Sequence, residues 1–537
     1  MSRAQQHPGL ILALVCLPVF IGALDLTIVS AVLPEVIRSM SIEIQKLDVA
    51  GWVVTGYFVS YAVSMTFMGK VSDIAGRRVV YLICLAIFFV GSWLVAASPG
   101  WPAAIAVSVI RLLPAHADSN LAPLYALIGG RVVQAFGAGA MVPVSMALVA
   151  DLFPTEKRAL PLGVVGAVDT AGWVLGHLYG GIMVQFMSWP YLFWLNLPIV
   201  FVMFCVTWWG LAGLPRVAVT GGIDWIGVTL LGVALILLNV GLGSPEIGAV
   251  QSTAAAPPHR WYWVATAAVV FAVFLFSQRR VRDPILDLRI FSNRNLSSAS
   301  AVNLLVGFCI MVALVSVPLF INILGAADTV KKAALVTGYL LCAFTVPMAF
   351  AAIPGGWLSE RLGYRSSVVL GLIVALVGFW LMSLWKPEMA HQAVVFFDHL
   401  RQGPESSDVR ATGFMAAGLA LAGIGTGLTI APVGTAVING VREQDRGMAS
   451  SLVIILRLIG MSVSMSSMTA YALRRTTILS QQMLAPEDAL DFEKFAKVTL
   501  YAITRIANEM ALISLAVAAI AVGVALLLRR GDISLAS

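Results

Sequence analysis

The stretch that decides the fold occurs twice in the chain. It reads Gly69-Lys-Val-Ser-Asp-Ile-Ala-Gly-Arg-Arg78 in the first half and Gly356-Trp-Leu-Ser-Glu-Arg-Leu-Gly-Tyr-Arg365 in the second, 287 residues later (356 − 69). A second match, 288 residues apart (444 − 156), relates Glu156-Lys-Arg158 to Gln444-Asp-Arg446. Two matches at nearly one offset predict that the second half of the chain repeats the structure of the first.

The composition around these stretches is that of a membrane protein. Of the 537 residues, 59% are hydrophobic and 11% are charged, whereas soluble domains carry about 25% charged residues. Segments such as 79–97 and 511–528 are apolar throughout, so they lack the period-two alternation of transmembrane strands. A soluble protein is excluded, and the sequence predicts an all-α polytopic membrane protein.

Fourteen apolar segments are long enough to cross a bilayer, which needs about 20 residues per helix. The repeat groups them into two pseudo-symmetric six-helix bundles with two extra linker helices, a transporter architecture. The predicted domains are an N-terminal bundle at 1–214, a linker at 215–290 and a C-terminal bundle at 291–537. The predicted spans are 9–33, 49–68, 79–98, 122–149, 160–185, 192–213, 225–243, 261–277, 296–321, 335–355, 366–385, 411–438, 448–473 and 506–528.

Basic residues indicate the orientation of these spans. Lys and Arg gather in short loops on the side of the repeated stretches, and the positive-inside rule places such loops in the cytoplasm. We therefore expect a multi-pass protein of the plasma membrane with both termini cytoplasmic. The net charge of +7 follows from this orientation, so no nucleic acid partner is expected.

Several motifs resemble the major facilitator superfamily, in its fourteen-span drug:proton antiporter branch. The loop 69–78 resembles the superfamily's signature loop, 24–34 its first-helix motif and 131–139 its fourth-helix motif. The fifth span has the glycine spacing of the antiporter motif, although His177 stands where the family has Pro. The residues of this helix-five motif are Gly172, Gly176, His177, Gly180 and Gly181. The resemblance implies a major facilitator fold and proton-coupled export.

The resemblance also implies that the two repeated loops gate the cytoplasmic side. Gly69 would permit a tight exit from the second span, and Asp73 would accept hydrogen bonds at a helix start. Arg77 and Arg78 would hold carboxylates or helix C-termini. The second loop has Tyr364 in place of one arginine, so its hold should be weaker. The predicted gating residues are Gly69, Asp73, Gly76, Arg77, Arg78, Glu360, Gly363 and Arg365.

Four ionisable residues, Asp25, Arg131, Asp169 and Arg457, lie at membrane depth in the predicted spans. A charge there costs several kcal/mol and persists when it is paired or functional. Asp25 and Arg131 lie about 15 and 13 Å from the outer ends of their helices, so they can pair. Asp169 and Arg457 are repeat equivalents, and a proton on Asp169 would break a bridge between them. Proton coupling is favoured over two fixed structural pairs.

Other polar residues have roles that the sequence leaves open. Gln134 and Asn303 would line a cavity or donate interhelical hydrogen bonds. His177 would line the cavity, relay protons or bond to a neighbouring helix. The five cysteines fall in separate apolar segments, so neither a disulfide nor a metal site is predicted. The chain has no Gly-x4-Gly-Lys phosphate loop, so we expect the proton gradient to supply the energy, with no cofactor.

The connection 474–505 is predicted to be a protruding helical hairpin that turns at Pro486. It resembles the extended terminal helices of mycobacterial triacylglycerol exporters in the same branch. An amphipathic loop lying on the bilayer is the alternative. The inserts 99–122 and 386–410 are interpreted as outer loops, either partner surfaces or passive. The hairpin positions that recur at three- and four-residue steps are Ala489, Phe492, Ala496 and Thr499.

Three functions from different classes follow. The first is a proton-coupled secondary transporter that exports amphiphilic or hydrophobic compounds, as in multidrug efflux. The second is an exporter of lipids such as triacylglycerol or glycolipid, favoured by the hairpin and by His177, and working with an outer-leaflet lipid-binding protein. The third, a membrane-embedded enzyme or a non-transporting receptor, is disfavoured because the chain has no HExxH, GxSxG or DxD signature. Expected partners are the lipid bilayer, protons and a hydrophobic or amphiphilic substrate.

Overall fold

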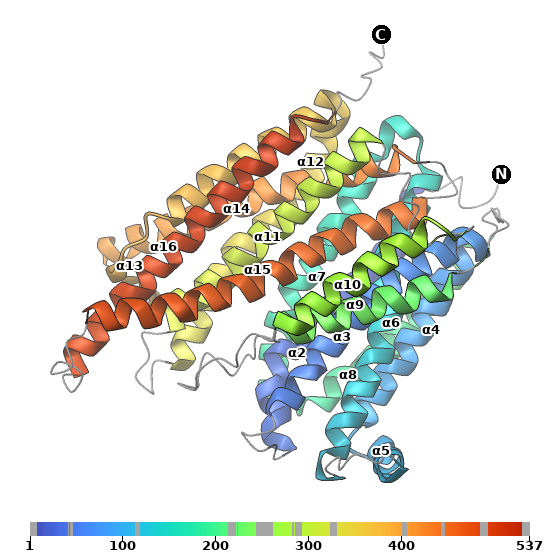
Figure 1. Ribbon diagram of the computed structural model, residues 1–537, viewed down its shortest axis with the longest axis horizontal. Coiled ribbons are helices and arrows are strands. Elements are labelled where there is room, and N and C mark those ends of the chain that lie inside the picture. Colours follow the sequence, from blue (N-terminus) through green and yellow to red (C-terminus); the bar gives the residue numbers. More distant parts are fainter. Residues whose placement is uncertain are drawn as a thin grey trace. The chain divides into compact units, whose positions relative to one another are not determined.

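The computed structural model is built of α-helices and short 3-10 turns, with no strand among the residues it describes (Figure 1). The description covers 8–40, 42, 47–112, 119–212, 222, 224–242, 261–281, 284, 293–322, 330–399, 405–441, 446–483 and 492–528. An all-α chain is what the bilayer requires, because helices satisfy every backbone hydrogen bond within one segment.

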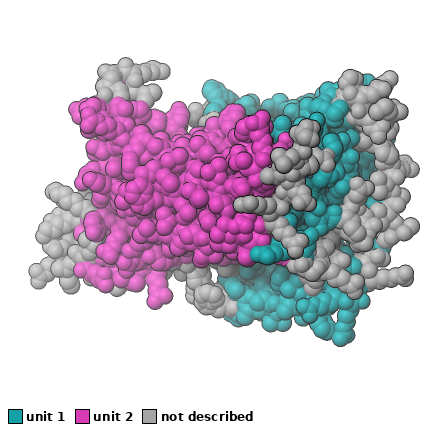
Figure 2. All heavy atoms as spheres, turned by 90° about the horizontal axis from the view of Figure 1, so that it is seen from above, with its two compact units in different colours: residues 1–252, 259–296, 434–455 teal, residues 253–258, 297–433, 456–537 magenta. Residues whose placement is uncertain are grey.

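The chain divides into two compact units (Figure 2). Unit 1 contains residues 1–252, 259–296 and 434–455, and unit 2 contains residues 253–258, 297–433 and 456–537. The helices that begin in unit 1 are α2 (Pro8–Ser39), α3 (Leu47–Ala75), α4 (Arg77–Ala97), α5 (Trp101–Leu112), η2 (Ser119–Leu121), α6 (Ala122–Leu152), η3 (Thr155–Lys157), α7 (Ala159–Phe186), α8 (Pro190–Gly210), α9 (Trp225–Leu242), α10 (Trp261–Gln278), α11 (Arg294–Asn322) and α15 (Arg446–Met483). Those that begin in unit 2 are α12 (Val330–Met382), α13 (Pro387–Asp398), α14 (Ser406–Ile438) and α16 (Phe492–Ala525).

Each predicted span coincides largely with a helix, and α12 holds two of them, separated at Gly363. Among the described residues, eight helices are long and apolar enough to cross a membrane. The predicted polytopic α-helical class is confirmed, and the count of fourteen spans stays a prediction.

The repeat is visible in the closest helix contacts. Gly137 of α6 lies against the backbone of Phe88 in α4. Gly425 of α14 lies in the same way against the backbone of Ala375 in α12. A Cβ at either glycine would collide with that backbone, so the absence of a side chain permits these close approaches. Further pairs at the 287/288 offset are Gly91–Gln134 with Gly378–Ala422, and Gly139–Tyr61 with Gly427–Met348.

Gly76 and Gly363, the central glycines of the two repeated loops, are also structural equivalents. They have φ values of 94° and 79° and are the positive-φ glycines among the described residues. This left-handed conformation favours glycine because other residues would bring Cβ into a clash. Gly76 separates α3 from α4, and Gly363 breaks α12.

The two inserts contain short helices, so the interpretation of them as loops was wrong for 101–112 and 387–398. Each helix begins with proline in its first turn, Pro102 in α5 and Pro387 in α13, where the missing N–H costs nothing. Trp101 packs against Trp93 of α4 with 5.3 Å between ring centroids, and Phe397 stacks on Tyr339 of α12 at 4.9 Å. These aromatic contacts hold the inserts against their own units.

The last two helices are long. α15 has 38 residues and α16 has 34, or about 57 and 51 Å at 1.5 Å per residue, whereas a bilayer core is about 30 Å thick. Their lengths agree with helices that continue past the membrane. The predicted turn at Pro486 lies outside the described residues.

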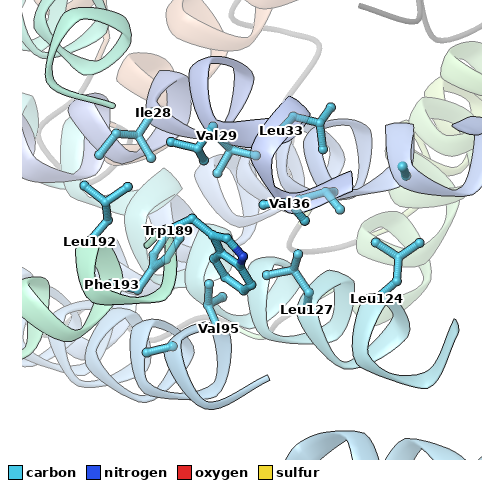
Figure 3. Packing of buried hydrophobic residues seen from close by; sticks show 14 of the residues in the cluster. Ile28, Val29, Leu33, Val36, Val95, Leu124, Leu127, Trp189, Leu192 and Phe193 are labelled. Carbon is cyan, nitrogen blue, oxygen red and sulfur yellow. The ribbon is translucent and has the colours of Figure 1, made fainter. Parts of the chain in front are cut away.

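A hydrophobic core joins α2, α4, α6 and α8 in unit 1 (Figure 3). Trp189, which precedes α8, lies among apolar side chains of these helices, and its indole N–H donates to Ser39 Oγ at 3.0 Å. Phe193 of α8 belongs to the same core. This packing fixes the first turns of α8 against α2, next to the polar groups described below.

Candidate functional site

Asp25 of α2 and Arg131 of α6 form an ion pair inside unit 1. Arg131 Nη1 donates to Asp25 Oδ2 at 2.5 Å, and Nη2 donates to the Asp25 backbone carbonyl at 3.1 Å. Both side chains are 0% exposed. The structure therefore brings together the two residues that the sequence placed at similar depth, and the pair satisfies two charges that would each be costly alone.

Two amides and a serine complete the hydrogen bonding of this pair. Gln134 Oε1 accepts from Arg131 at 2.7 Å, while Gln134 Nε2 donates to Asp25 Oδ1 at 3.1 Å and to Ser92 Oγ of α4 at 2.9 Å. Asn196 Nδ2 of α8 donates to Asp25 Oδ1 at 3.3 Å. Gln134 thus acts as an interhelical hydrogen-bonding residue, one of the two roles considered for it. Sequence reasoning missed Ser92 and Asn196.

Aromatic rings enclose the guanidinium group. Arg131 Cζ lies 3.8 Å from the ring centroid of Tyr57 in α3 and 5.8 Å from that of Phe193, positions that favour a cation–π attraction. Five helices, α2, α3, α4, α6 and α8, thus meet at one buried set of side chains. We call Asp25, Tyr57, Ser92, Arg131, Gln134 and Asn196 the Asp25 cluster.

The second repeat has no such cluster at the equivalent positions. At the 287/288 offset, Arg131, Gln134, Ser92 and Tyr57 correspond to Leu419, Ala422, Phe379 and Phe344, all of them buried. The same glycine contacts persist in both repeats, as shown above. Helix packing of this kind therefore does not require the polar groups, and this asymmetry favours a functional role for them.

The equivalent of Asp25 is found from helix contacts. Gly172 of α7 lies against Phe20 O and Leu24 N, and its counterpart Gly460 of α15 lies against Leu304 O and Phe308 N. Asp25 then corresponds to Cys309, which follows Phe308 and is 2% exposed. A thiol that packs as a small apolar group thus stands where the first repeat has a carboxylate.

The first repeated loop differs in detail from its prediction. Gly69 and Asp73 lie inside α3, which runs on to Ala75, so Gly69 is not a tight exit and Asp73 is not at a helix start. The reason is that the chain turns at Gly76, the residue with positive φ. Asp73 accepts from Arg77 one turn along the chain, and Arg77 also donates to Ser72 Oγ at 2.7 Å.

Asp151, at the end of α6, was missed by sequence reasoning and joins two basic residues. Arg77 Nε lies 3.4 Å from Asp151 Oδ2, and Arg446 Nη1 lies 2.8 Å from Oδ1. We call this arrangement the Asp151 bridge. Arg446 opens α15 and belongs to the part of the second repeat that packs in unit 1. Arg78 instead donates to the carbonyl oxygen of Trp208 at 3.1 Å, near the end of α8.

Serines beside the bridge add two contacts between α15 and the first repeat. Ser450 Oγ donates to Pro143 O of α6 at 3.0 Å, and Ser451 Oγ donates to Met65 O of α3 at 2.6 Å. Both serines are 0% exposed. If this side gates the transporter, as the resemblance of the loops implies, these contacts have to separate.

Asp151→Asn is expected to loosen this region. Of the two ion pairs that Asp151 makes, the one with Arg446 joins α15 to the first repeat. Losing this partly exposed pair costs about 1 kcal/mol, which is about a fivefold change in an equilibrium. Maleimide labelling of a cysteine introduced as Ser451→Cys should therefore be about fivefold faster in Asp151→Asn than in the parent. The control Glu388→Asn changes an exposed carboxylate in the first turn of α13, in unit 2, and should leave the rate unchanged. Equal rates in all three proteins would remove the Asp151 bridge from any gating role.

The second repeated loop turns at Gly363 as the first turns at Gly76, but its side chains make different contacts. Arg361 stacks over Trp357 with 4.1 Å between Cζ and the ring centroid. Glu360 and Arg365 are half-buried on either side of the break. Their role in gating stays a prediction.

Asp169 of α7 and Arg457 of α15 are buried, 2% and 8% exposed, but belong to different units. Their pairing stays a prediction. If it exists, Arg457→Ala should be less stable than Asp169→Asn/Arg457→Ala, because the single variant leaves a lone buried charge. Thermal unfolding in detergent measures this, and equal midpoints for the two proteins would refute the pairing.

The helix-five glycines pack α7 against α2. Side chains at Gly172 and Gly176 would overlap the carbonyl oxygens of Phe20 and Leu24, and Thr27 Oγ1 donates to Trp173 O at 2.8 Å. This face thus contacts the helix that carries Asp25. Gly180 is buried in the same helix, whereas the side chain of His177 and the surroundings of Gly181 lie outside the described residues.

Two further predictions concern the remaining polar groups. Asn303 of α11 is buried at 4% exposure, in unit 2, and its role in lining a cavity stays a prediction. Within the described ranges, no group of three or more His, Cys, Asp or Glu side chains is placed to hold a metal ion.

Comparison with known families decides the class. The model of the Major Facilitator Superfamily matches residues 15–465. This range includes the Asp25 cluster and both pairs of repeated sequence stretches. The chain belongs to the Major Facilitator Superfamily. The resemblance drawn from its motifs is thereby confirmed, and this member of the superfamily is a multi-pass membrane transporter.

Relatives with substantial coverage come from mycobacteria. A triacylglyceride transporter of Mycolicibacterium smegmatis is 32% identical over 461 residues, covering 86% of this chain and 75% of the relative. One of Mycolicibacterium hassiacum is 31% identical over 484 residues, covering 89% and 82%. A triacylglyceride transporter of Mycobacteroides abscessus is 30% identical over 475 residues, covering 88% and 84%.

Solved structures of other superfamily members share the fold. The human organic anion transporter MFSD10 (TETRAN) is 14% identical with a TM-score of 0.55, covering 96% of this chain and all of that one. The proton:xylose symporter XylE is 12% identical with a TM-score of 0.55, covering 94% of each chain. At such identities the likeness concerns the fold alone, and it agrees with the predicted major facilitator architecture.

Proposed function

We propose that this superfamily member is a proton-coupled exporter of neutral lipid, with a triacylglycerol-like molecule as its first candidate substrate. The names of relatives about 30% identical over most of both chains carry the substrate class. Of the functions inferred from sequence, this is the lipid exporter. Export of amphiphilic drugs is the second candidate, and the antiporter-type glycine spacing of α7 favours it.

The Asp25 cluster supports the coupling part of the proposal. Asp25 is a fully buried carboxylate whose two oxygens accept hydrogen bonds from α6 and α8. Transporters use intramembrane carboxylates as proton sites. A proton on Asp25 would remove its charge, weaken its bonds to Arg131 and both amides, and so release α2 from α6 and α8. Because the second repeat is apolar here, the proton would act on the first repeat.

The surroundings of the transporter follow from the same proposal. The protein lies in the plasma membrane with cytoplasmic termini, and it needs no cofactor and no enzymatic step, because the proton gradient supplies the energy. An outer-leaflet lipid-binding protein would receive the exported lipid. The long α15 and α16 would reach toward such a partner.

A reconstituted assay tests the proposal. Proteoliposomes that hold a fluorescent triacylglycerol are mixed with a soluble lipid acceptor, with and without an imposed pH gradient. We expect transfer to the acceptor that depends on the gradient and stops when an ionophore collapses it. A lipophilic cation is tested in parallel. Gradient-driven movement of the cation without lipid transfer would replace the lipid assignment by the drug one, and transfer indifferent to the ionophore would refute proton coupling.

A further inference from the structure

Arginines gather where α15 and α16 pack together in unit 2. Arg475 donates to both carboxylate oxygens of Glu509, from Nε to Oε2 at 3.0 Å and from Nη2 to Oε1 at 2.9 Å. Tyr471 donates to Oε2 at 2.6 Å, and Arg505 Nε donates to Oε1 at 3.2 Å. Glu509 is therefore held by side chains of both helices, and one carboxylate faces two guanidinium groups.

The charge of this set is not balanced. Arg474 precedes Arg475 and is exposed, so the four residues Arg474, Arg475, Arg505 and Glu509 carry three positive charges and one negative charge. The side chain of Arg505 is 50% exposed and gives only one hydrogen bond to Glu509. Arg475 is committed to Glu509 by two bonds, whereas Arg474 and Arg505 retain donors for a ligand.

Neighbouring residues place the set at a membrane boundary. Asn508 Nδ2 donates to the carbonyl oxygen of Trp385 at 2.9 Å, and Trp385 lies just beyond the end of α12. Its ring packs on Phe320 near the end of α11, with 5.1 Å between centroids. Arg505 lies five residues after the start of the apolar segment Leu500–Ala525, which is long enough to cross a membrane, or about 7.5 Å along α16. A position this near the end of the segment suits contact with a lipid headgroup.

Exposed side chains of different polarity flank Arg505 on α16. Leu512, on the membrane side, is 49% exposed, and Tyr501, on the other side, is 46% exposed. Spacings of four and seven residues put all three on one helix face. A lipid acyl chain lying along Leu512 would bring its headgroup to Arg505. A similar arrangement occurs on α15, where Val463 and Arg474 are both exposed. They are eleven residues, or about three helical turns, apart, so an apolar side chain and an arginine again share one helix face.

We propose that Arg474 and Arg505 bind the phosphodiester headgroup of an anionic phospholipid, with Arg475 held beside Arg505 by their shared partner Glu509. Guanidinium groups bind phosphate oxygens with paired donors, and two of them beside an apolar helix face suit a ligand that has both a phosphate and acyl chains. The site is separate from the Asp25 cluster. It does not depend on which substrate is exported or on proton coupling.

Native mass spectrometry of the full-length protein tests this site. The protein is purified in detergent with equal amounts of phosphatidylglycerol and phosphatidylcholine. We expect wild type to retain phosphatidylglycerol preferentially, and Arg474→Gln/Arg505→Gln to lose about tenfold in that preference. Arg280→Gln is the matched control, because Arg280 is an exposed arginine at a helix end that stacks on Phe276. It should behave as wild type.

A second variant separates binding from folding. Arg474→Lys/Arg505→Lys keeps both charges but loses the paired donors, so its preference should lie between those of wild type and of the Gln variant. Unchanged retention in the folded Gln variant would overturn the proposal, as would an equal loss of phosphatidylcholine, since the arginines would then only anchor the helices to the interface. Release of the lipid by millimolar inorganic phosphate would also overturn it, because the site would then take a soluble anion.

Discussion

Asp25→Asn is expected to abolish gradient-driven transport, lowering it at least about 100-fold, while the protein still folds. Asparagine is nearly isosteric and still accepts a hydrogen bond through Oδ1, so Gln134 and Asn196 keep a partner. What is lost is the charge that binds Arg131 at 2.5 Å and, in the proposed coupling, the group that takes up a proton. A transporter whose coupling depends on that charge cannot convert a pH gradient into substrate movement.

The measurement is the proteoliposome assay, run in two modes. Gradient-driven transfer should vanish in Asp25→Asn, whereas exchange of labelled for unlabelled substrate at equal pH should persist, because exchange needs no net proton movement. Asp224→Asn is a matched control. Asp224 is also a buried carboxylate, 7% exposed, and accepts from Gln278 Nε2 at 2.6 Å between the linker helices α9 and α10. Its variant should transport normally.

The outcome against coupling at Asp25 is specific. A folded Asp25→Asn protein that transports at the wild-type rate in both modes would assign the cluster to structure alone. Equal loss in Asp25→Asn and Asp224→Asn would show that any buried carboxylate matters to folding, and the comparison would then say nothing in favour of Asp25.

The sequence could predict the Asp25–Arg131 pair because a helix rises by a fixed distance per residue. Counting from the helix ends put both charges at one depth, and two buried charges of opposite sign have a strong reason to meet. The repeated motif located the two loops, but it placed the turn of the first loop at Gly69, whereas the chain turns at Gly76. The depth of a residue in a helix and the repetition of a motif can both be read from the sequence alone.

The sequence could not predict which uncharged groups join the cluster. Asn196 is 171 residues from Asp25, and its direction depends on how α8 is rotated, which core residues such as Trp189 and Phe193 determine. Asp151 was missed because it falls between two predicted spans, 122–149 and 160–185, where a carboxylate is ordinary, although it is still part of α6. Glu509 fell near the start of the last predicted span, and only the fold shows that Arg475 approaches it from another helix.

Arg131→Leu is expected to be the most destabilising single change in unit 1. The Asp25 side chain is 0% exposed, and the variant leaves its charge without a cation. The free energy of unfolding should therefore fall by about 3–5 kcal/mol. Taking about 2–4 °C per kcal/mol as for a large domain, the melting midpoint should fall by on the order of 10 °C. The second repeat shows how the loss can be reversed, because it packs Leu419, Ala422 and Cys309 at the same positions.

The triple variant Asp25→Cys/Arg131→Leu/Gln134→Ala copies the second repeat at these three positions. It should regain part of the lost stability, since replacing a buried ion pair by apolar groups is often neutral, although Ser92 and Asn196 lose their partners. Thermal unfolding in detergent measures both proteins, and the transport assay should find the triple variant inactive. A stable but inactive triple variant would separate the cluster's function from its packing. If the triple variant were instead as unstable as Arg131→Leu, the two repeats would not be interchangeable here, and the asymmetry between them would have a structural cause.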